Sequence, residues 1–243
     1  MTATITKVEV FSVAMPLVGT FTSGGMSKSA TKCVVIRITD SDGAIGISSI
    51  DPSTRATSPN TAPELAAAMR DIVGPALIGQ DAGNANRIYE IASKLVPEQP
   101  GACVGMELAC IELTCQRLGI AVHDYVGGAV LDKVKFNGWV GELPPEDAVA
   151  EALKFTDAGF ESMKIKVGND VDKDSARVMA VRDAVGPDVQ LRMDANQQCN
   201  VEQALALCHA VKSCNMQLFE QPTPKDDLEG LAQVRRDGGV PIM

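Results

Sequence analysis

From Lys133 to the last residue, the sequence alternates between short apolar segments and longer amphipathic ones, and this alternation limits the fold more than any other feature. Segments with the length and composition of strands are Val134–Val140, Glu161–Val167, Val189–Asp194, Met216–Glu220 and the start of a fifth at Val240–Met243. The predicted helices between them are Glu146–Ala158, Asp172–Val185, Val201–Lys212 and Asp226–Arg236. Strands that alternate with helices form a parallel sheet with helical crossovers, so the sequence predicts an α/β fold.

The spacing of these strands leaves two architectures open. They recur about every 25 to 30 residues, which fits both a doubly wound sheet and a (β/α)₈ barrel. A dinucleotide-binding doubly wound sheet carries a GxGxxG turn after its first strand. The segment in that place, Val140–Pro145, has no such glycine pattern. The sequence therefore favours the barrel.

The first part of the chain has a different organisation. An antiparallel meander is predicted from strand-like segments at Ile5–Met15, Cys33–Thr39 and Ala44–Ile47. Two polar segments are predicted to be loops, Gly19–Ser29 and Pro52–Pro63. Helices are expected at Pro63–Ile72, at Ala85–Val96, and along an apolar face of Val104, Leu108, Ile111, Cys115 and Leu118. The predicted domains are thus an α+β domain at residues 1–130 and a barrel segment at residues 131–243.

Composition excludes several classes of protein. The net charge of −9 argues against nucleic acid or an anionic membrane as the main partner. No apolar stretch approaches the roughly 18 residues of a membrane span, and no signal peptide opens the sequence. The seven cysteines include no CxxC pair, so we expect reduced, mostly buried thiols in a cytoplasmic protein.

Charged side chains stand where three successive barrel strands end. Because side chains alternate along a strand, Lys164 and Lys166 lie on one face of theirs. Asp194 ends the next strand, Glu220 ends the one after it, and Asn196 follows two residues beyond Asp194. Barrel enzymes build their active sites at this edge, so these residues form the candidate site.

Carboxylates delivered singly from neighbouring strands suit Mg²⁺, which prefers oxygen ligands. A lysine beside such an ion can act as a general base, because nearby positive charge disfavours its ammonium form. The structural alternative is that Lys164 with Glu220, or Lys166 with Asp194, only forms an ion pair across the sheet. Two inward lysines in a buried strand need a facing anion in either case.

Three motifs give a more specific indication: Lys164-Ile165-Lys166, Asp194-Ala195-Asn196 and Phe219-Glu220-Gln221-Pro222. With the opening strand at 5–9, the helix end at 117–123, Gly127-Gly128 and Ala158-Gly159-Phe160, they resemble the enolase superfamily. Within it, the KxK motif resembles the muconate-lactonizing-like subgroup of the mandelate racemase/muconate lactonizing enzyme family. The resemblance covers nearly the whole chain. It implies an N-terminal α+β capping domain followed by an incomplete enolase-type (β/α) barrel that ends in its fifth strand.

The resemblance also implies residue roles. This family abstracts a proton α to a carboxylate and stabilises the resulting enediolate with Mg²⁺. Lys166 is implied as the base, with Lys164 near the substrate carboxylate. Asp194 and Glu220 are implied as Mg²⁺ ligands and Asn196 as a polar contact behind them. Capping-domain loops would close over a small carboxylate substrate, and their residues are Thr20, Phe21, Thr22, Ser23, Gly24, Gly25, Ile50 and Asp51.

Several functions remain open at this point. The KxK form favours racemisation or epimerisation of an amino-acid derivative, such as an N-acyl amino acid, a dipeptide or a proline betaine. Cycloisomerisation and dehydration are alternatives. The family's third carboxylate ligand and opposing acid/base are expected beyond Met243, so we interpret the chain as a truncated form of a homo-oligomeric enzyme. A hypothesis of another class is an inactive remnant or binding fragment.

Overall fold

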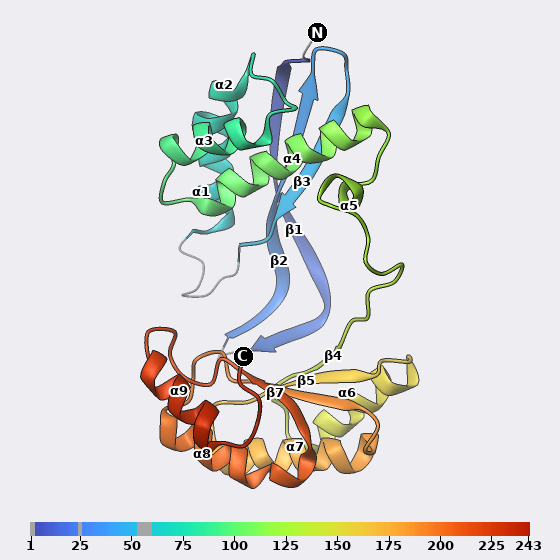
Figure 1. Ribbon diagram of the computed structural model, residues 1–243, viewed down its shortest axis with the longest axis vertical. Coiled ribbons are helices and arrows are strands. Elements are labelled where there is room, and N and C mark those ends of the chain that lie inside the picture. The colour runs from blue at the N-terminus through green and yellow to red at the C-terminus, as the bar shows by residue number, and fades with distance from the viewer. Residues whose placement is uncertain (1–2, 24–25, 53–59) are drawn as a thin grey trace. The chain divides into compact units, whose positions relative to one another are not determined.

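The computed structural model describes residues 3–23, 26–52 and 60–243 (Figure 1). By its contacts the chain divides into two compact units. The first unit comprises residues 1–18 and 29–132, and the second comprises residues 19–28 and 133–243. The division into domains at 1–130 and 131–243 stays a prediction. No helix among the described residues is long and apolar enough to cross a membrane.

A three-stranded sheet has the order β1-β2-β3, and most of its residues belong to the first unit. Its strands are β1 (Ile5–Ser23), β2 (Met26–Asp40) and β3 (Ile45–Ile50). β2 and β3 pair antiparallel, as the sequence predicted for the meander. Asp40 ends β2 and accepts hydrogen bonds from two backbone N–H groups of the following turn and from the Arg117 side chain. Burial raises the pKa of the Asp40 carboxyl, but these hydrogen bonds outweigh burial and leave its pKa below the usual value.

The segment Gly19–Ser29 is not a loop, so this prediction was wrong for the residues that the structure describes. β1 continues to Ser23 and β2 begins at Met26. Polar composition indicated a loop, yet Thr and Phe are also common in strands. Two predicted loop residues lie outside the described residues, Gly24 and Gly25. Most of the second predicted loop, residues 53–59, also lies outside them.

Helices follow the three strands, close to where the sequence predicted them. They are α1 (Ala62–Ala67), a π-helix (Ala68–Val73), α2 (Gly74–Leu77), α3 (Ala85–Leu95), α4 (Pro100–Leu118) and α5 (Val122–Tyr125). Gly119 ends α4 in the left-handed conformation, which a residue without a side chain adopts readily.

The predicted apolar face of α4 is correct only in part. Cys115 is buried, but Val104, Leu108 and Leu118 are exposed. The core side is formed by smaller residues and by Met106 and Leu113. Small side chains allow a close approach to β3. A Cβ atom at Gly46 would lie only 2.0 Å from the carbonyl oxygen of Ala109.

The second unit alternates strands and helices. They are β4 (Gly138–Val140), α6 (Pro145–Asp157), β5 (Ser162–Lys166), α7 (Val171–Val185), β6 (Gln190–Asp194), α8 (Val201–Ala210), β7 (Met216–Glu220) and α9 (Leu228–Asp237). The four strands form a parallel sheet in the order β4-β5-β6-β7. Figure 1 shows α7 and α8 along one side of this sheet. The predicted α/β architecture is therefore confirmed.

One end of this sheet differs from the sequence prediction, and the other end agrees with it. β4 covers only the last three residues of the predicted strand Val134–Val140, and the apolar side chains of Val134 and Phe136 are exposed. A strand requires a pairing partner, and the pairing of β4 with β5 begins only at Gly138. At the other end, Pro241 and Met243 exchange backbone hydrogen bonds with Phe219 of β7, so a fifth parallel segment does begin there.

Candidate active site

Two lysines and two carboxylates come together at the C-terminal edge of the parallel sheet. The register pairs Lys166 of β5 with Asp194 of β6, and Asp194 with Glu220 of β7. Three charged residues therefore stand side by side at the same level of adjacent strands. Lys164, two residues earlier in β5, extends from the same face because the side-chain period of a strand is two.

Ion pairs connect all four side chains. Lys166 Nζ donates to Asp194 Oδ2, and Lys164 Nζ donates to Glu220 Oε2 at 2.6 Å. Lys164 Nζ also lies 3.6 Å from Asp194 Oδ2. The Lys166–Asp194 pair is buried, with side chains 8% and 2% exposed, whereas Lys164 and Glu220 keep 22% and 29% exposure. The cluster thus has one pair beneath the surface and one pair open to an incoming molecule.

Asn196 joins the buried pair. Its Oδ1 accepts a hydrogen bond from Lys166 Nζ at 2.9 Å, and its backbone N–H donates to Asp194 Oδ1 at 2.9 Å. Its φ of 47° is in the left-handed region, which asparagine tolerates better than most residues. The short turn after β6 thereby returns an amide oxygen to the lysine.

The turns after β5, β6 and β7 interlock. The N–H of Gln197 donates to the carbonyl of Gln221 at 2.8 Å, and both residues have positive φ. Gly168, after β5, has a φ of 120°, and a Cβ atom there would lie 3.0 Å from the carbonyl oxygen of Ala195. The turn that follows the lysine strand therefore lies directly against the turn that follows Asp194.

The predicted substrate-loop residues are not brought together in one element. Ile50 ends β3 and packs against the core of the first unit, while Asp51 accepts a hydrogen bond from the Thr31 hydroxyl at 2.6 Å. Residues 20–23 belong to β1, and segment 19–28 groups with the second unit, which also contains the lysines. The roles of these residues in substrate binding stay predictions.

The donor set at the edge of the sheet suits part of a magnesium site. Asp194 and Glu220 present carboxylates from adjacent strands, and hard oxygen ligands of this kind are those that Mg²⁺ takes in proteins. In the described part of the chain, no group of three or more His, Cys, Asp or Glu side chains is gathered to hold a metal. The two residues could therefore supply two of the ligands of such an ion.

All seven cysteines are free, buried thiols, as the sequence predicted. Burial raises the pKa of Cys110 to about 12 and that of Cys199 and Cys208 to about 11. A thiol must ionise to become a nucleophile, so these residues are unreactive at neutral pH. The candidate chemistry therefore belongs to the lysines and carboxylates.

The second unit is a parallel β/α segment with two lysines and two carboxylates toward the ends of its strands, and an α+β unit precedes it, as the resemblance to the enolase superfamily implies. Residues 3–127 match the N-terminal domain of mandelate racemase / muconate lactonizing enzyme, and residues 147–243 match the enolase C-terminal domain-like family. The chain belongs to the mandelate racemase/muconate lactonizing enzyme family of the enolase superfamily.

Relatives with known activities are similar along almost the whole chain. The chain is 29% identical to the L-Ala-D/L-Glu epimerase of Bacillus subtilis and 30% identical to the hydrophobic dipeptide epimerase of Enterococcus faecalis, over 98% of its length in each case. A solved structure of dipeptide epimerase from Enterococcus faecalis, complexed with Mg and the dipeptide L-Leu-L-Tyr, superposes on 99% of the chain with a TM-score of 0.94 and 29% identity. The chain spans about two-thirds of the length of these relatives, at 66%, 67% and 67% respectively.

Proposed function

We propose that this chain forms part of a racemase or epimerase that removes a proton α to the carboxylate of an amino-acid derivative. The observation that carries the proposal is the position of Lys166, whose amine is buried against Asp194 and Asn196 at the C-terminal edge of the sheet. A lysine amine held in one place by its hydrogen-bond partners is a suitable general base, because proton transfer requires the base to be positioned within reach of the substrate hydrogen.

Lys166 is the proton acceptor in this proposal. In the resting arrangement its ammonium group donates to both Asp194 and Asn196, so Lys166 must first transfer one proton to solvent water and release Asp194. The neutral amine then accepts the α-proton from carbon, and the electron pair stays on the substrate. Asn196 then holds the amine in place through the remaining hydrogen bond. A positioned base of this kind typically accelerates proton transfer by about 100- to 10,000-fold.

Lys164 has a different task. Its side chain is more exposed than that of Lys166, and its ammonium group bonds to the partly exposed carboxylate of Glu220. An accessible cation next to the base is suited to attract and orient the substrate carboxylate. The substrate α-carbon would thereby lie near Lys166.

Asp194 and Glu220 would hold Mg²⁺. When bound, this ion supplies the positive charge that stabilises negative charge developing on the substrate carboxylate. The two carboxylates are now paired with lysines, so both would exchange an ammonium partner for the ion.

The substrate class that we propose is a dipeptide or an N-acyl amino acid. Similarity to two dipeptide epimerases at 29% and 30% identity supports this class over a cycloisomerisation substrate. Both candidate substrates carry a carboxylate next to the carbon that bears the exchangeable hydrogen. The small, partly exposed Lys164–Glu220 pair offers a cation for that carboxylate.

Exchange of the substrate α-hydrogen in deuterated water tests the proposal, with Mg²⁺ present and a panel of dipeptides and N-acyl amino acids followed by mass spectrometry. Lys166→Ala is expected to lower the exchange rate by at least about 100-fold. Lys135→Ala, which removes an exposed lysine paired with Glu161, is the matched control and should exchange at the wild-type rate. Exchange by Lys166→Ala at the wild-type rate would remove Lys166 from the base role.

The inactive-remnant hypothesis is tested in the same assay. Titration of Mg²⁺ into the 243-residue chain, with exchange as the readout, distinguishes a working site from a remnant. Exchange that rises with Mg²⁺ and saturates would reject the remnant hypothesis. No exchange with any substrate at any Mg²⁺ concentration would reject the proposed activity for this chain.

A further inference from the structure

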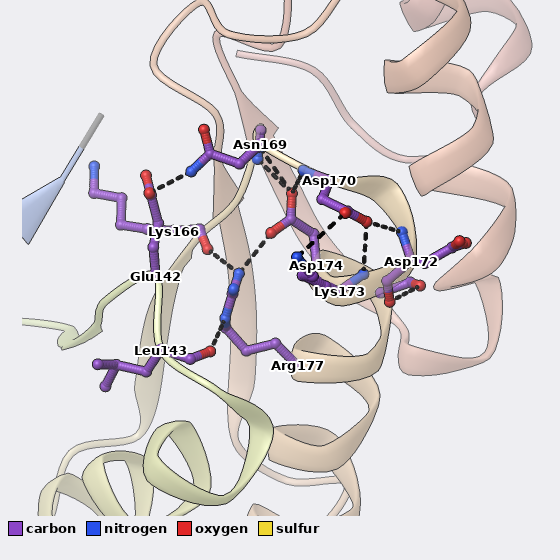
Figure 2. Close-up of polar contacts among 11 residues, drawn as sticks. Glu142, Leu143, Lys166, Asn169, Asp170, Asp172, Lys173, Asp174 and Arg177 are labelled. Carbon is purple, nitrogen blue, oxygen red and sulfur yellow. Dashed lines mark hydrogen bonds and ion pairs between the residues drawn. The ribbon is translucent and has the colours of Figure 1, made fainter. Parts of the chain in front are cut away.

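Helix α7 contains two charged residues that are buried and lie outside the lysine–carboxylate cluster. Asp174 is 2% exposed and Arg177 is 6% exposed, and Arg177 Nη1 lies 2.7 Å from Asp174 Oδ1 (Figure 2). A buried ion pair is seldom more stabilising than apolar residues of the same volume, because both charges lose their hydration. The reason for burying this pair is therefore to be sought in the other hydrogen bonds that Asp174 and Arg177 make.

Arg177 reaches the backbone of the strand that carries the lysines. Its Nη1 donates to the carbonyl of Lys166 at 2.9 Å, and its Nε donates to the carbonyl of Leu143 at 2.5 Å. Leu143 lies between β4 and α6, so one guanidinium group connects the ends of two neighbouring strands. The rigid fork of a guanidinium fixes both carbonyls in a single geometry, which a flexible ammonium group does not do.

Asp174 binds the backbone of the turn that follows β5. Its Oδ2 accepts hydrogen bonds from the backbone N–H groups of Gly168 at 2.7 Å, Asn169 at 3.1 Å and Asp170 at 3.3 Å. The Asn169 side chain in turn donates to Glu142, in the turn after β4 (Figure 2). Both oxygens of Asp174 are thus engaged, one with Arg177 and one with the turn.

These contacts fix the Lys166 backbone from the side opposite its amine. Its carbonyl is held by Arg177, and the next N–H, that of Val167, donates to the carbonyl of Asp194 at 3.1 Å. The side chain leaves this fixed backbone toward Asp194 and Asn196. Arg177 therefore affects the amine only through the position of the backbone.

We propose that Asp174 and Arg177 are positioning residues, which hold the end of β5 so that the Lys166 amine stays in register with the turn after β6. The inference rests on the proposed function in which Lys166 is the base. A misplacement of a reacting group by about 1 Å can lower a rate by about 100-fold, so a backbone clamp behind the base has a direct kinetic consequence. Because Asp174 and Arg177 are both buried, we expect substrate binding to depend little on them.

The same helix provides a matched control. Arg182 lies near the other end of α7 and also clamps backbone carbonyls, those of Cys214 at 2.9 Å, Gly186 at 2.6 Å and Val189 at 2.7 Å. These carbonyls lie before β6 and β7 rather than at their C-terminal ends. Arg182→Lys therefore removes a comparable guanidinium clamp far from Lys166.

Hydrogen–deuterium exchange of the full chain tests the clamp without any need for turnover. Arg177→Met, which fills the space without hydrogen bonds, and the milder Arg177→Lys are compared with Arg182→Lys and wild type. Arg177→Met should raise amide exchange at residues 167–170 by at least about tenfold and leave residues 216–220 unchanged, with Arg177→Lys intermediate. Arg182→Lys should raise exchange near 186–190 and leave 167–170 at the wild-type rate.

Kinetics then separate positioning from general stability. With the substrate and Mg²⁺ that support α-hydrogen exchange, Arg177→Lys should lower kcat by about 10- to 100-fold per folded molecule with KM within about threefold of wild type. Arg182→Lys should keep the wild-type kcat once corrected for the folded fraction. Unchanged amide exchange at 167–170 in both Arg177 variants, or a raised KM with unchanged kcat, would overturn the proposal. If wild type shows no α-hydrogen exchange, the proposed function fails, while the amide data still decide whether the clamp fixes β5.

Discussion

Replacement of the buried pair Lys166–Asp194 by apolar residues separates a structural ion pair from a functional one. In Asp194→Asn the ammonium group of Lys166 stays buried without its anion. Removal of one partner of a buried pair typically destabilises a protein by about 3–5 kcal/mol. Asn196 still accepts from Lys166 at 2.9 Å, so we expect the lower end of that range, about 3 kcal/mol. Lys166→Met should cost about 2–3 kcal/mol, because Lys164 remains 3.6 Å from Asp194.

The double variant Lys166→Met/Asp194→Leu removes both charges and is expected to differ. Apolar pairs of similar volume usually leave stability unchanged or raise it by about 1–4 kcal/mol. We therefore expect the double variant to be at least as stable as wild type and to have lost α-hydrogen exchange completely. If the double variant is more stable than wild type but inactive, the two charges are present for function rather than for stability.

The assay is urea unfolding followed by tryptophan fluorescence. Trp139 is the only tryptophan and lies in β4, next to the lysine strand, so its signal reports on the second unit. Lys135→Met, at an exposed pair, should change stability by less than about 0.5 kcal/mol and is the control. A double variant as unstable as either single variant would show that the pair is needed for the fold, and the functional interpretation of its burial would be wrong.

Three further predictions concern other parts of the chain. The cysteines should resist a thiol reagent in the folded protein at pH 8 and react fully in denaturant, since burial raises the pKa of groups such as Cys110 to about 12; rapid labelling of folded protein would contradict this. The pKa of the Asp40 carboxyl is lower in the folded protein than in the unfolded chain, so ionised Asp40 stabilises the fold above the unfolded pKa, and this stabilisation is lost as the pH falls through the folded pKa. Arg117→Leu, which removes a partner of Asp40, should make the free energy of unfolding less dependent on acid pH, as measured by circular dichroism. An unchanged pH profile would refute this assignment. Gly46→Ala should destabilise the first unit by about 3 kcal/mol or more, because the new Cβ atom would lie 2.0 Å from the Ala109 carbonyl oxygen. A melting temperature equal to that of wild type would exclude this close approach of α4 to β3.

Local patterns in the sequence were sufficient for the order of elements in the second unit and for the four charged residues of the cluster. Alternation placed Lys164 and Lys166 on one face, and strand ends placed Asp194 and Glu220 beside them, as the register shows. These predictions succeeded because parallel strands connected by helices bring their C-terminal ends to one edge.

Features that depend on the partner of a segment were missed. The apolar residues Val134 and Phe136 are suited to a strand, but among the described residues the pairing of β4 with β5 begins only at Gly138. On α4, Leu108 was predicted to lie in the core but is exposed, whereas Leu113 is buried in the core. The contact of Arg177 with the lysine strand could not be predicted, because a hydrogen bond from a helix side chain to the Lys166 carbonyl leaves no periodic signal in the sequence. Only the three-dimensional register reveals such contacts.

The ion-pair and catalytic interpretations of the cluster describe the same atoms and differ in what they require of the backbone. A structural ion pair needs only that Lys166 and Asp194 lie opposite each other in the sheet. The observed site also keeps Asn196 in the left-handed region with φ 47° and Gly168 at φ 120°, conformations that L-residues with side chains seldom adopt. Positive φ costs about 1–3 kcal/mol at most non-glycine residues and less at asparagine, and such conformations are concentrated at functional sites. The Asn196 conformation returns an amide oxygen to the lysine, a contact that a charge already paired with aspartate does not need for stability, so the backbone favours the catalytic interpretation.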